Sequence, residues 1–204
     1  MTMMQQVGFD TLLAETEAIN KQRVLERETA HLPSTMEDGI RYYRHLLAQH
    51  HEAMLRADLE TIQVIREDAT NLAKRLNGGK FGILAHEHSS GCILERETAA
   101  APLTIPLWGQ IGDFIIDIDG VRTRIQMEGM IGMKGMCMHW QGFSIRAVDT
   151  HLPFFSDTGF RSFTGVHADI IEDWTPDIFV TYIVREYRRS ELKGRLVPIA
   201  ERWR

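Results

Sequence analysis

Two histidines and a cysteine near the middle of the chain are the residues best suited to metal chemistry. His86 and His88 are separated by one residue, and Cys92 follows four residues later. Together with Cys137 or His139 from a neighbouring strand, they would supply four nitrogen and sulfur ligands for zinc. Their spacing matches no standard zinc module, however, and imidazoles in a loop of serine and glycine are usually only solvated. The sequence therefore favours a solvated loop and keeps zinc binding as an alternative.

A repeat of three residues follows, in which glycine and methionine recur from Glu128 to Met136. The soft side chains in and around it are Met127, Met130, Met133, Met136, Cys137 and His139. Thioether, thiolate and imidazole groups are the ligands that Cu(I) prefers, so copper binding is one interpretation. Suitable side chains do not make a metal site unless they can surround the ion, and the sequence does not show such a geometry. A period of three residues also fits neither a strand nor an α-helix. We therefore favour a loop whose methionines fill gaps over a hydrophobic surface or make adaptable contacts.

The remaining titratable groups form no catalytic motif. We read His45, His50 and His51 as the partly buried surface of one helix. Acidic residues and histidines also surround an aromatic-rich stretch further on: Asp149, His151, Asp157, His167, Asp169, Glu172 and Asp173. Such a mixture suits acid-base chemistry only if it lines a pocket, and no nucleophile motif, P-loop or dinucleotide-binding glycine pattern accompanies it. The sequence therefore predicts no catalytic or cofactor-binding residue and favours a protein that is not an enzyme.

Basic residues gather at the C-terminal end of the chain. The last twenty residues hold seven arginine and lysine side chains against three glutamates, a formal charge of about +4, which leaves about −9 for the rest. Four of these cations are expected in the last turns of a helix, where they complement the helix dipole: Arg185, Arg188, Arg189 and Lys193. Beyond that helix, basic charge is combined with an aromatic ring in Arg195, Arg202, Trp203 and Arg204. Basic and aromatic side chains can contact phosphate and stack on a base, so nucleic-acid binding is a second alternative.

The stretch from Asp113 to Met127 predicts a β-hairpin, on which we expect the fold to be organised. Asp119-Gly120 lies between two segments in which apolar and polar residues alternate, and this pattern predicts a two-residue turn. With that turn Ile118 faces Val121, and the alternation gives one largely apolar face. The other face carries an opposite-charge pair of Asp117 and Arg122.

Helices are predicted before this hairpin. Residues 8–31 suit an amphipathic helix with a narrow apolar stripe, and Pro33 ends it. Ser34 with Glu37 predicts a capping box for the next helix. The pattern can restart at Asp58 as an N-cap, which gives a helical hairpin ending at Asn77-Gly78-Gly79. One continuous helix of forty residues is the competing interpretation.

Strands and a last helix are predicted after residue 80, where glycine, aromatic and β-branched residues become frequent. Besides the hairpin arms, the candidate strands are Gly91–Glu97, Ile105–Trp108 and Cys137–Val148. Residues 149–165 are expected to wrap over the sheet edge as an ordered loop. Thr175-Pro176-Asp177 predicts the start of a helix that packs on the sheet. The fold class is α+β, with a helical region at 1–79 and a sheet of four or five antiparallel strands with its C-terminal helix at 80–204, both in one cooperative unit.

Four short segments share a pattern with known proteins: Leu107–Gln110, Gly120–Ile125, Met127–Met130 and Gly159–Phe163. Together they resemble a family of uncharacterised proteobacterial proteins that are often associated with mobile or plasmid-like DNA. The resemblance extends over Gly78 to Gly165. It implies no activity, cofactor or catalytic residue for this chain.

Composition limits the remaining classes of protein. At 204 residues and 44% apolar content the chain can bury an ordinary core, and its net charge of −5 argues against a wholly basic nucleic-acid coat. Two cysteines are too few for a disulfide framework, and the N-terminus lacks a signal-peptide pattern, so we expect a cytoplasmic protein. No apolar run approaches the length of a membrane span, so no membrane partner is expected.

These observations favour a non-catalytic binding or regulatory protein that acts through protein–protein contacts. Amphipathic helices and loops rich in methionine and aromatic residues make contact surface. The alternatives are a small metal-binding protein or metal-dependent enzyme that uses His86, His88 and Cys92, and a nucleic-acid-associated protein that uses the basic C-terminus. The narrow stripe of residues 8–31 must be buried, and we expect a homodimer that pairs these N-terminal helices.

Overall fold

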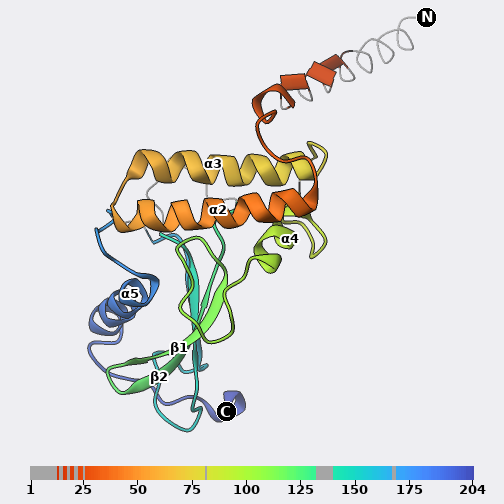
Figure 1. Cartoon of the computed structure of the whole chain (residues 1–204). Coiled ribbons are helices and arrows are strands. Elements are labelled where there is room, and N and C mark those ends of the chain that lie inside the picture. Colours follow the sequence, from red (N-terminus) through yellow and green to blue (C-terminus); the bar gives the residue numbers. More distant parts are fainter. Residues whose placement is uncertain are drawn as a thin grey trace, which may run out of the picture.

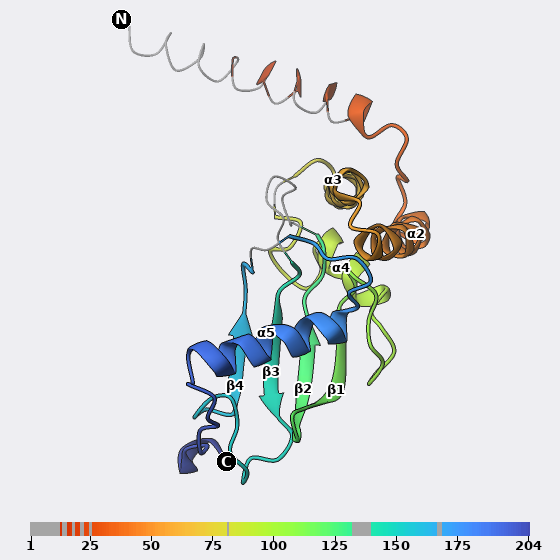
Figure 2. The same ribbon diagram turned by 90° about the vertical axis from the view of Figure 1, so that its left-hand side faces the viewer.

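A four-stranded antiparallel sheet forms the centre of the fold, with helices at one end and across one face. The computed structural model describes residues 26–80, 82–131, 140–166 and 169–204, together with residues 13, 16, 17, 19, 20, 23 and 24. Two long helices lie side by side across one end of the sheet (Figure 1). Helix α5 (Pro176–Ser190) lies across one face of the strands (Figure 2). This arrangement confirms the predicted α+β class with a C-terminal helix on the sheet.

The two long helices form the predicted helical hairpin. Helix α2 (Met36–Leu55) and helix α3 (Leu59–Leu76) are separated by a short turn in which Ala57 has a positive φ of 51°. The side chain of Asp58 accepts a hydrogen bond from the backbone N–H of Thr61 at 3.1 Å and so caps α3. The alternative of one continuous helix is therefore wrong.

The start of α2 differs by one residue from the prediction. Thr35, and not Ser34, is the N-cap, and its hydroxyl accepts from the N–H of Asp38 at 3.2 Å. Its hydroxyl also donates to the Asp38 carboxylate at 2.7 Å, so Asp38 takes the position expected for Glu37. Further along, Gly39 lets α3 approach closely, because a Cβ there would lie 2.7 Å from a methyl of Leu76. In the predicted N-terminal helix, the residues that the structure describes up to Glu28 are helical, and most of the others lie outside the described residues.

Strands β1 (Gly112–Ile118) and β2 (Val121–Met127) form the predicted hairpin in the predicted register. Ile118 pairs with Val121, and Asp117 pairs with Arg122. Both turn residues have positive φ, 54° at Asp119 and 84° at Gly120, as the tight hairpin turn requires. The side chain of Asp117 closes the turn by accepting from the N–H of Gly120 at 2.7 Å.

Strands β3 (Phe143–Ala147) and β4 (Phe160–Phe163) complete the sheet in the order β1-β2-β3-β4. The prediction of Cys137–Val148 covered β3 but began too early, and residues 132–139 lie outside the described part. The prediction that residues 149–165 form only a loop was wrong, because β4 lies within them. It pairs with β3 along its whole length, for example Arg146 with Phe160, and so covers that edge with a strand.

Two predicted strands are absent from the sheet. Residues Gly91–Glu97 belong to helix α4 (Ser90–Glu97). Leucine, glutamate and arginine are good helix formers, and burial of Gly91 and Leu94 three residues apart fits a helix better than a strand.

The segment Ile105–Trp108 is not a strand either. Its Pro106 has no N–H to give to a strand ladder. The loop around it still follows the edge of β1, since Leu103 donates its N–H to the carbonyl of Asp113 at 2.9 Å. The edge of β1 is therefore covered by a loop.

Aromatic side chains fill the space between the sheet and α5. The rings of Trp140 and Phe179 stack with centroids 4.5 Å apart, and Trp108 meets Phe179 edge-on at 5.5 Å. Trp108 also ties this core to the loop before α5, because its indole N–H donates to the carbonyl of Trp174 at 2.7 Å. Burial of each ring stabilises the fold by about 1.5–3 kcal/mol, so α5 is firmly held on this face of the sheet.

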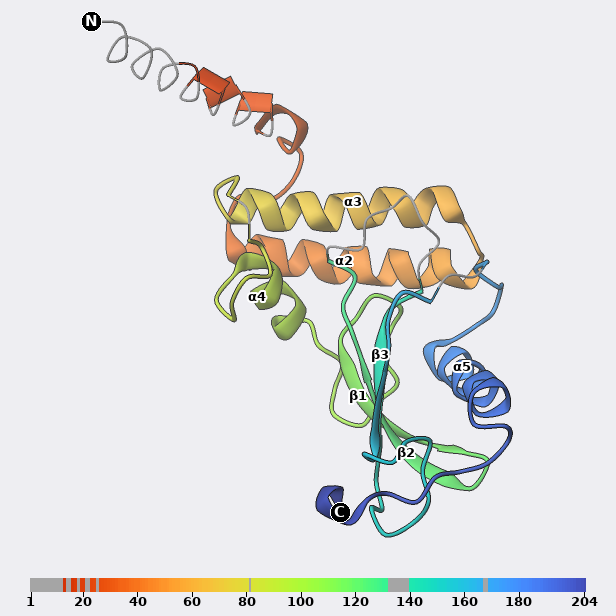
Figure 3. The same ribbon diagram turned by 180° about the vertical axis from the view of Figure 1, so that it is seen from behind.

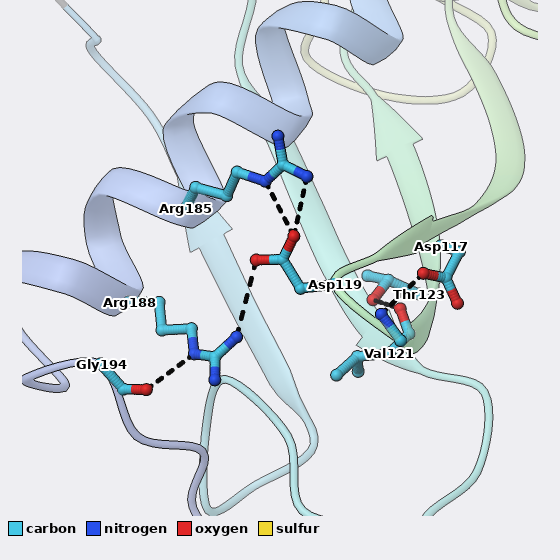
Figure 4. A network of polar contacts seen from close by, with 8 residues as sticks. Asp117, Asp119, Val121, Thr123, Arg185, Arg188 and Gly194 are labelled. Carbon is cyan, nitrogen blue, oxygen red and sulfur yellow. Dashed lines mark hydrogen bonds and ion pairs between the residues drawn. The ribbon is translucent and has the colours of Figure 1, made fainter.

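The hairpin turn is held against α5 by ion pairs, as Figure 4 shows. The carboxylate of Asp119 accepts from the Arg185 guanidinium at 2.7 and 3.0 Å, and lies 3.6 Å from that of Arg188. Arg188 in turn donates to the carbonyl of Gly194 at 3.0 Å, just beyond the helix. The pairs are partly exposed, so each contributes at most about 1 kcal/mol, but together they fix the position of the turn.

The C-terminal segment passes from α5 around the end of the sheet to the opposite side. In Figures 1 and 3 it lies on the side of the sheet away from α5. The segment is tied down by a two-way backbone bridge between Val197 and Phe154, with both N···O distances 2.8 Å. The 3₁₀ turn η1 (Glu201–Trp203) follows.

The helical hairpin ends close to the predicted boundary at residue 79, but the division into 1–79 and 80–204 stays a prediction. Among the residues that the structure describes, no helix combines the length and the apolar character needed to cross a membrane.

The hairpin turn gives the first testable prediction. We expect Gly120→Val to lower the free energy of unfolding by at least about 1–2 kcal/mol, because a β-branched residue is strained at positive φ. A Cβ at this position meets no atom within 4 Å, so the cost is backbone strain and not a clash. Gly120→Asn is the control, since asparagine tolerates this conformation, and urea denaturation measures both variants. Equal stability of the valine variant and the unchanged protein would contradict the assigned turn.

Candidate nucleic-acid interface

The face of the sheet away from α5, which we name the open face, carries mostly polar side chains. Strand alternation assigns ten residues to it: Asp113, Ile115, Asp117, Arg122, Arg124, Gln126, Ser144, Arg146, Phe160 and Ser162. All of them are exposed or half-buried. The other face carries the apolar partners that pack toward α5. A sheet with one packed face and one solvated face is usual in antiparallel folds, so the types of residue on the open face decide whether it has a function.

One row of the open face runs straight across all four strands. Ile115 pairs with Arg124, Arg124 with Arg146, and Arg146 with Phe160. The row therefore places two arginines directly opposite each other on neighbouring strands. Like charges in that position destabilise a sheet by up to about 1 kcal/mol, so the arrangement is not explained by folding alone.

The arginines of the open face differ in their partners. Arg124 forms a two-pronged ion pair with Asp113, in which its Nε donates at 2.7 Å, and this carboxylate raises the pKa of Arg124. Arg146 instead lies over the ring of Phe160, with 5.4 Å from its Cζ to the ring centroid. Within the described part of the chain neither Arg146 nor Arg122 forms an ion pair. Two guanidinium groups are thus free to receive an anion.

Two shallow hollows lie along this face and meet at Arg146. One has a volume of about 360 Å³ and is lined by Asp113, Arg124, Gln126, Ser144 and Arg146. The other has a volume of about 430 Å³ and is lined by Arg146, Ala147, Thr150, Thr158, Gly159, Phe160 and Trp203. The open face is therefore a surface with a continuous polar and aromatic lining.

The structure brings part of the predicted C-terminal site to this surface. Trp203 lines the second hollow and is 52% exposed. The neighbouring Arg202 and Arg204 are also exposed, and the guanidinium of Arg202 lies 5.8 Å from the Trp203 ring centroid. Arg195 is exposed directly after α5 but lines neither hollow. The predicted group is thus divided, with Trp203 at the open face.

Sequence analysis missed Arg124, Arg146 and Phe160. The signal that could have found the arginines is their alternation with apolar residues in β2 and β3, which puts them on the solvated face. Their neighbours in the sheet come from distant parts of the chain, so the row itself was not visible. By contrast, the arginines of α5 are already paired: Arg185 and Arg188 with Asp119, and Arg189 with Glu186.

The predicted metal ligands are only partly described. His86 and His88 lie in the turn before α4, with ring centroids 6.3 Å apart, and Cys92 is a half-buried free cysteine in α4. Cys137 and His139 lie outside the described residues. Among the residues that are described, no three histidine, cysteine, aspartate or glutamate side chains gather so that they could hold a metal ion. Zinc binding that involves Cys137 or His139 stays a prediction.

The methionine repeat is likewise described only in part. Met127 and Met130 are buried in the core, where the Met130 sulfur lies close to Gly109. These two side chains fill space, as favoured from the sequence. Met133 and Met136 lie outside the described residues, so copper binding there stays a prediction.

His50 is a core residue, which corrects the prediction that it belongs to the helix surface. It is fully buried between α2 and α3 and accepts at Nε2 from Nε of Arg66 at 3.0 Å. Its Nδ1 therefore carries the proton and donates to the carbonyl of Trp108 at 2.9 Å. Burial and the Arg66 charge lower the pKa of His50 to about 3, so the ring is neutral and structural. His45 is exposed and His51 is half-buried, as expected.

The acidic residues around the aromatic stretch are solvated. Asp149, His151, Asp157, Asp169, Glu172 and Asp173 are all exposed, and His167 lies outside the described residues. The carboxylate of Asp149 accepts from the backbone N–H of His151 at 2.9 Å, which is an ordinary turn contact. These residues therefore support no acid-base site.

Glu95 of α4 is a half-buried acid that sequence analysis did not single out. Burial raises its pKa to about 7, and the nearby Glu128 contributes in the same direction. Its Oε1 accepts from the N–H of Ile131 at 3.2 Å and lies so close to Gly129 that a Cβ there would be 1.9 Å away. A perturbed pKa can mark a functional site. Here the described contacts hold the segment after β2, so we read Glu95 as a structural acid.

Two proteins named KlcB, both from Escherichia coli, are similar to this chain. One is 34% identical over 143 residues, which are 68% of this chain and 30% of that protein. The other is 35% identical over 111 residues, which are 54% of this chain and 27% of that protein. The match thus spans less than a third of each relative, and it fits the resemblance to an uncharacterised proteobacterial family. No family model matches the chain, and no solved structure matches it significantly.

The raised pKa of Glu95 gives a prediction for stability against pH. Between about pH 4.5 and 7 the folded protein holds a proton that the unfolded chain has released, so the free energy of unfolding falls as pH rises through this window. Glu95→Gln keeps an acceptor for the Ile131 N–H and removes this dependence. We expect the variant to be more stable by about 1–3 kcal/mol at pH 8 and no more stable at pH 4. Denaturant unfolding at both pH values measures it, and an equal gain at both would contradict the assigned protonation.

Proposed function

We propose that this protein binds nucleic acid through the open face of its sheet. The observation that carries the proposal is the row in which Arg124 and Arg146 face each other while Arg146 has no carboxylate partner among the described residues. The Asp113 carboxylate offsets part of the charge of Arg124, and the repulsion that remains costs at most about 1 kcal/mol in the free protein. A bound anion relieves the repulsion between the two guanidinium groups, so the row is better suited to the bound state than to the free one.

The arginine side chains suit phosphate in particular. A guanidinium group presents several donors in one plane and binds phosphate oxygens through two hydrogen bonds at once. Arg124 and Arg146 lie opposite each other on adjacent strands, about 5 Å apart in the direction across the sheet, and Arg122 lies two residues before Arg124 on β2. A chain of phosphates that crosses from β3 to β2 can therefore meet Arg146 and Arg124, with Arg122 beside them for a further phosphate. Gln126 and Ser144 are additional hydrogen-bonding groups in the hollow that Arg124 and Arg146 line.

The charge of the whole chain limits the affinity. The net charge of −5 opposes long-range attraction of a polyanion, and Asp113 and Asp117 lie on the same face as the arginines. We count about three phosphate contacts. For a single strand, a plot of the logarithm of the binding constant against the logarithm of the salt concentration then has a slope of about −2. We infer weak binding at physiological salt, with a dissociation constant of about 10⁻⁵ M, within the range of non-specific complexes.

The sequence also predicts a regulatory role, a homodimer and metal binding. A regulatory role in the cytoplasm belongs to the same proposal. The predicted homodimer rests on N-terminal residues that lie mostly outside the described part and stays a prediction. Metal binding stays a prediction as well.

Protein–protein contact, which the sequence favoured first, is a second candidate with one observation in its favour. Ile171, Ile178 and Tyr182 are 44–48% exposed at and just before α5, and the Tyr182 ring packs on Trp174 at 4.9 Å. Exposed apolar side chains on neighbouring turns suit a protein partner. This surface belongs to α5 and is thus separate from the open face.

A charge-neutralising variant tests the proposed function. We expect Arg146→Gln to weaken binding of a fluorescein-labelled DNA strand of about 12 nucleotides by about 5- to 10-fold at low salt, because one charge-assisted phosphate contact is lost. The salt slope should also become shallower by about 0.7. Fluorescence anisotropy at several salt concentrations measures both effects.

Arg189→Gln is the matched control, because it removes the same charge from α5, where Arg189 is exposed and paired with Glu186. We expect its affinity to stay within about 2-fold of the unchanged protein. Equal losses in the two variants would mean that only net charge matters, and an unchanged affinity of Arg146→Gln would exclude the open face as the binding surface.

A further inference from the structure

The hollow at the β4 end of the open face has an unusual lining for a solvated surface. It is formed by β3, β4, the loops beside them and η1, which are far apart in the sequence. Phe160 is 41% exposed and Trp203 is 52% exposed, and both line this hollow of about 430 Å³. Large aromatic rings gain stability from burial, so two half-exposed rings that share one hollow mark a binding surface.

Both rings are held in place by described contacts. Phe160 lies within β4, which is paired to β3. Trp203 follows a segment fixed by the bridge from Val197 and by the N–H of Ala200, which donates to the carbonyl of Asp157 at 2.8 Å. The carbonyl of Ala200 then accepts from the N–H of Trp203 itself at 2.8 Å. The indole is therefore presented by ordered backbone, as a preformed stacking surface must be.

We infer that this hollow binds an unpaired nucleobase, so that the ligand of the open face is a single strand. The inference rests on the proposed function and adds to it a subsite and a class of substrate. A base can stack on the indole or on the Phe160 ring, and the guanidinium plane of Arg146 can stack as well. The same guanidinium also borders the hollow lined by Arg124, into which the phosphate next to that base would fit.

Duplex nucleic acid cannot use this subsite. Its bases are stacked on each other inside the helix, so only phosphates reach the arginines, whereas a single strand offers a free base beside each phosphate. A free mononucleotide has the same base and phosphate but cannot reach across to the second hollow. The two hollows meet at Arg146, which favours a strand over a mononucleotide.

Binding of matched ligands to the intact chain tests this inference. The probes are oligothymidylate of about 12 nucleotides, the same strand paired to oligoadenylate, an abasic strand of equal length, and thymidine monophosphate. We expect oligothymidylate to bind more tightly than each of the other three by at least about 5-fold, which is the low end of the contribution of one stacked base. It should also quench tryptophan fluorescence, because Trp203 is the most exposed of the described indoles.

Two variants identify the stacking residue. Trp203→Ala should lower the affinity for oligothymidylate by at least about 5-fold. Its affinities for the abasic strand and for the duplex should stay within about 2-fold of those of the unchanged protein. Trp203→Phe should keep most of the affinity, since it still stacks, but lose the quenching. A purely structural role of Trp203 would weaken all ligands together, which would overturn the inference.

The remaining outcomes separate this inference from the proposed function. If duplex and abasic strand bind as tightly as oligothymidylate and Arg146→Gln still weakens them, the proposed function stands and the base subsite is wrong. If thymidine monophosphate binds as tightly as the strand, the hollow is a nucleotide site and the single-strand ligand is wrong. If none of the probes binds, both proposals are wrong.

Discussion

The register set by the Asp119–Gly120 turn is the constraint on which the rest of this structure depends. Side chains alternate with a period of two along a strand, so a slip of one residue would move every side chain of a strand to the other face. Such a slip would place Arg124 in the core and Ile125 in water. The turn is fixed by the positive φ of both residues and by the ion pairs of Asp119 with Arg185 and Arg188 (Figure 4). The two faces of the sheet can therefore differ completely in chemistry.

These two faces divide stability from the proposed binding. On the α5 side, stacked rings such as Trp140 and Phe179 each contribute about 1.5–3 kcal/mol by burial. On the open side, the opposition of Arg124 and Arg146 costs up to about 1 kcal/mol. The burial of the core rings offsets this cost. The fold can therefore hold a row of like charges, although the row itself lowers stability. Departures from local consistency of this kind are expected at functional sites.

Sequence reasoning predicted the parts of the fold that local pattern determines. The register of the hairpin, the cap at Asp58 and the start of α5 after Thr175 all follow from residues close together in the chain. Helix α4 was taken for a strand because a short apolar run has no clear period. The candidate site was predicted least well. Phe160 and Trp203 are more than forty residues apart, and only the pairing of β4 and the path of the C-terminal segment around the sheet bring them to one hollow.

Backbone amide shifts in NMR spectra, followed during titration with oligothymidylate, test the central claim most directly, since they report which face of the sheet the strand contacts. The account predicts that the largest shifts occur at Arg124, Arg146, Phe160 and Trp203, while the outer residues of α5 around Ile178 change little. Shifts concentrated on α5 or on the α2–α3 hairpin, with the open face unchanged, would contradict it.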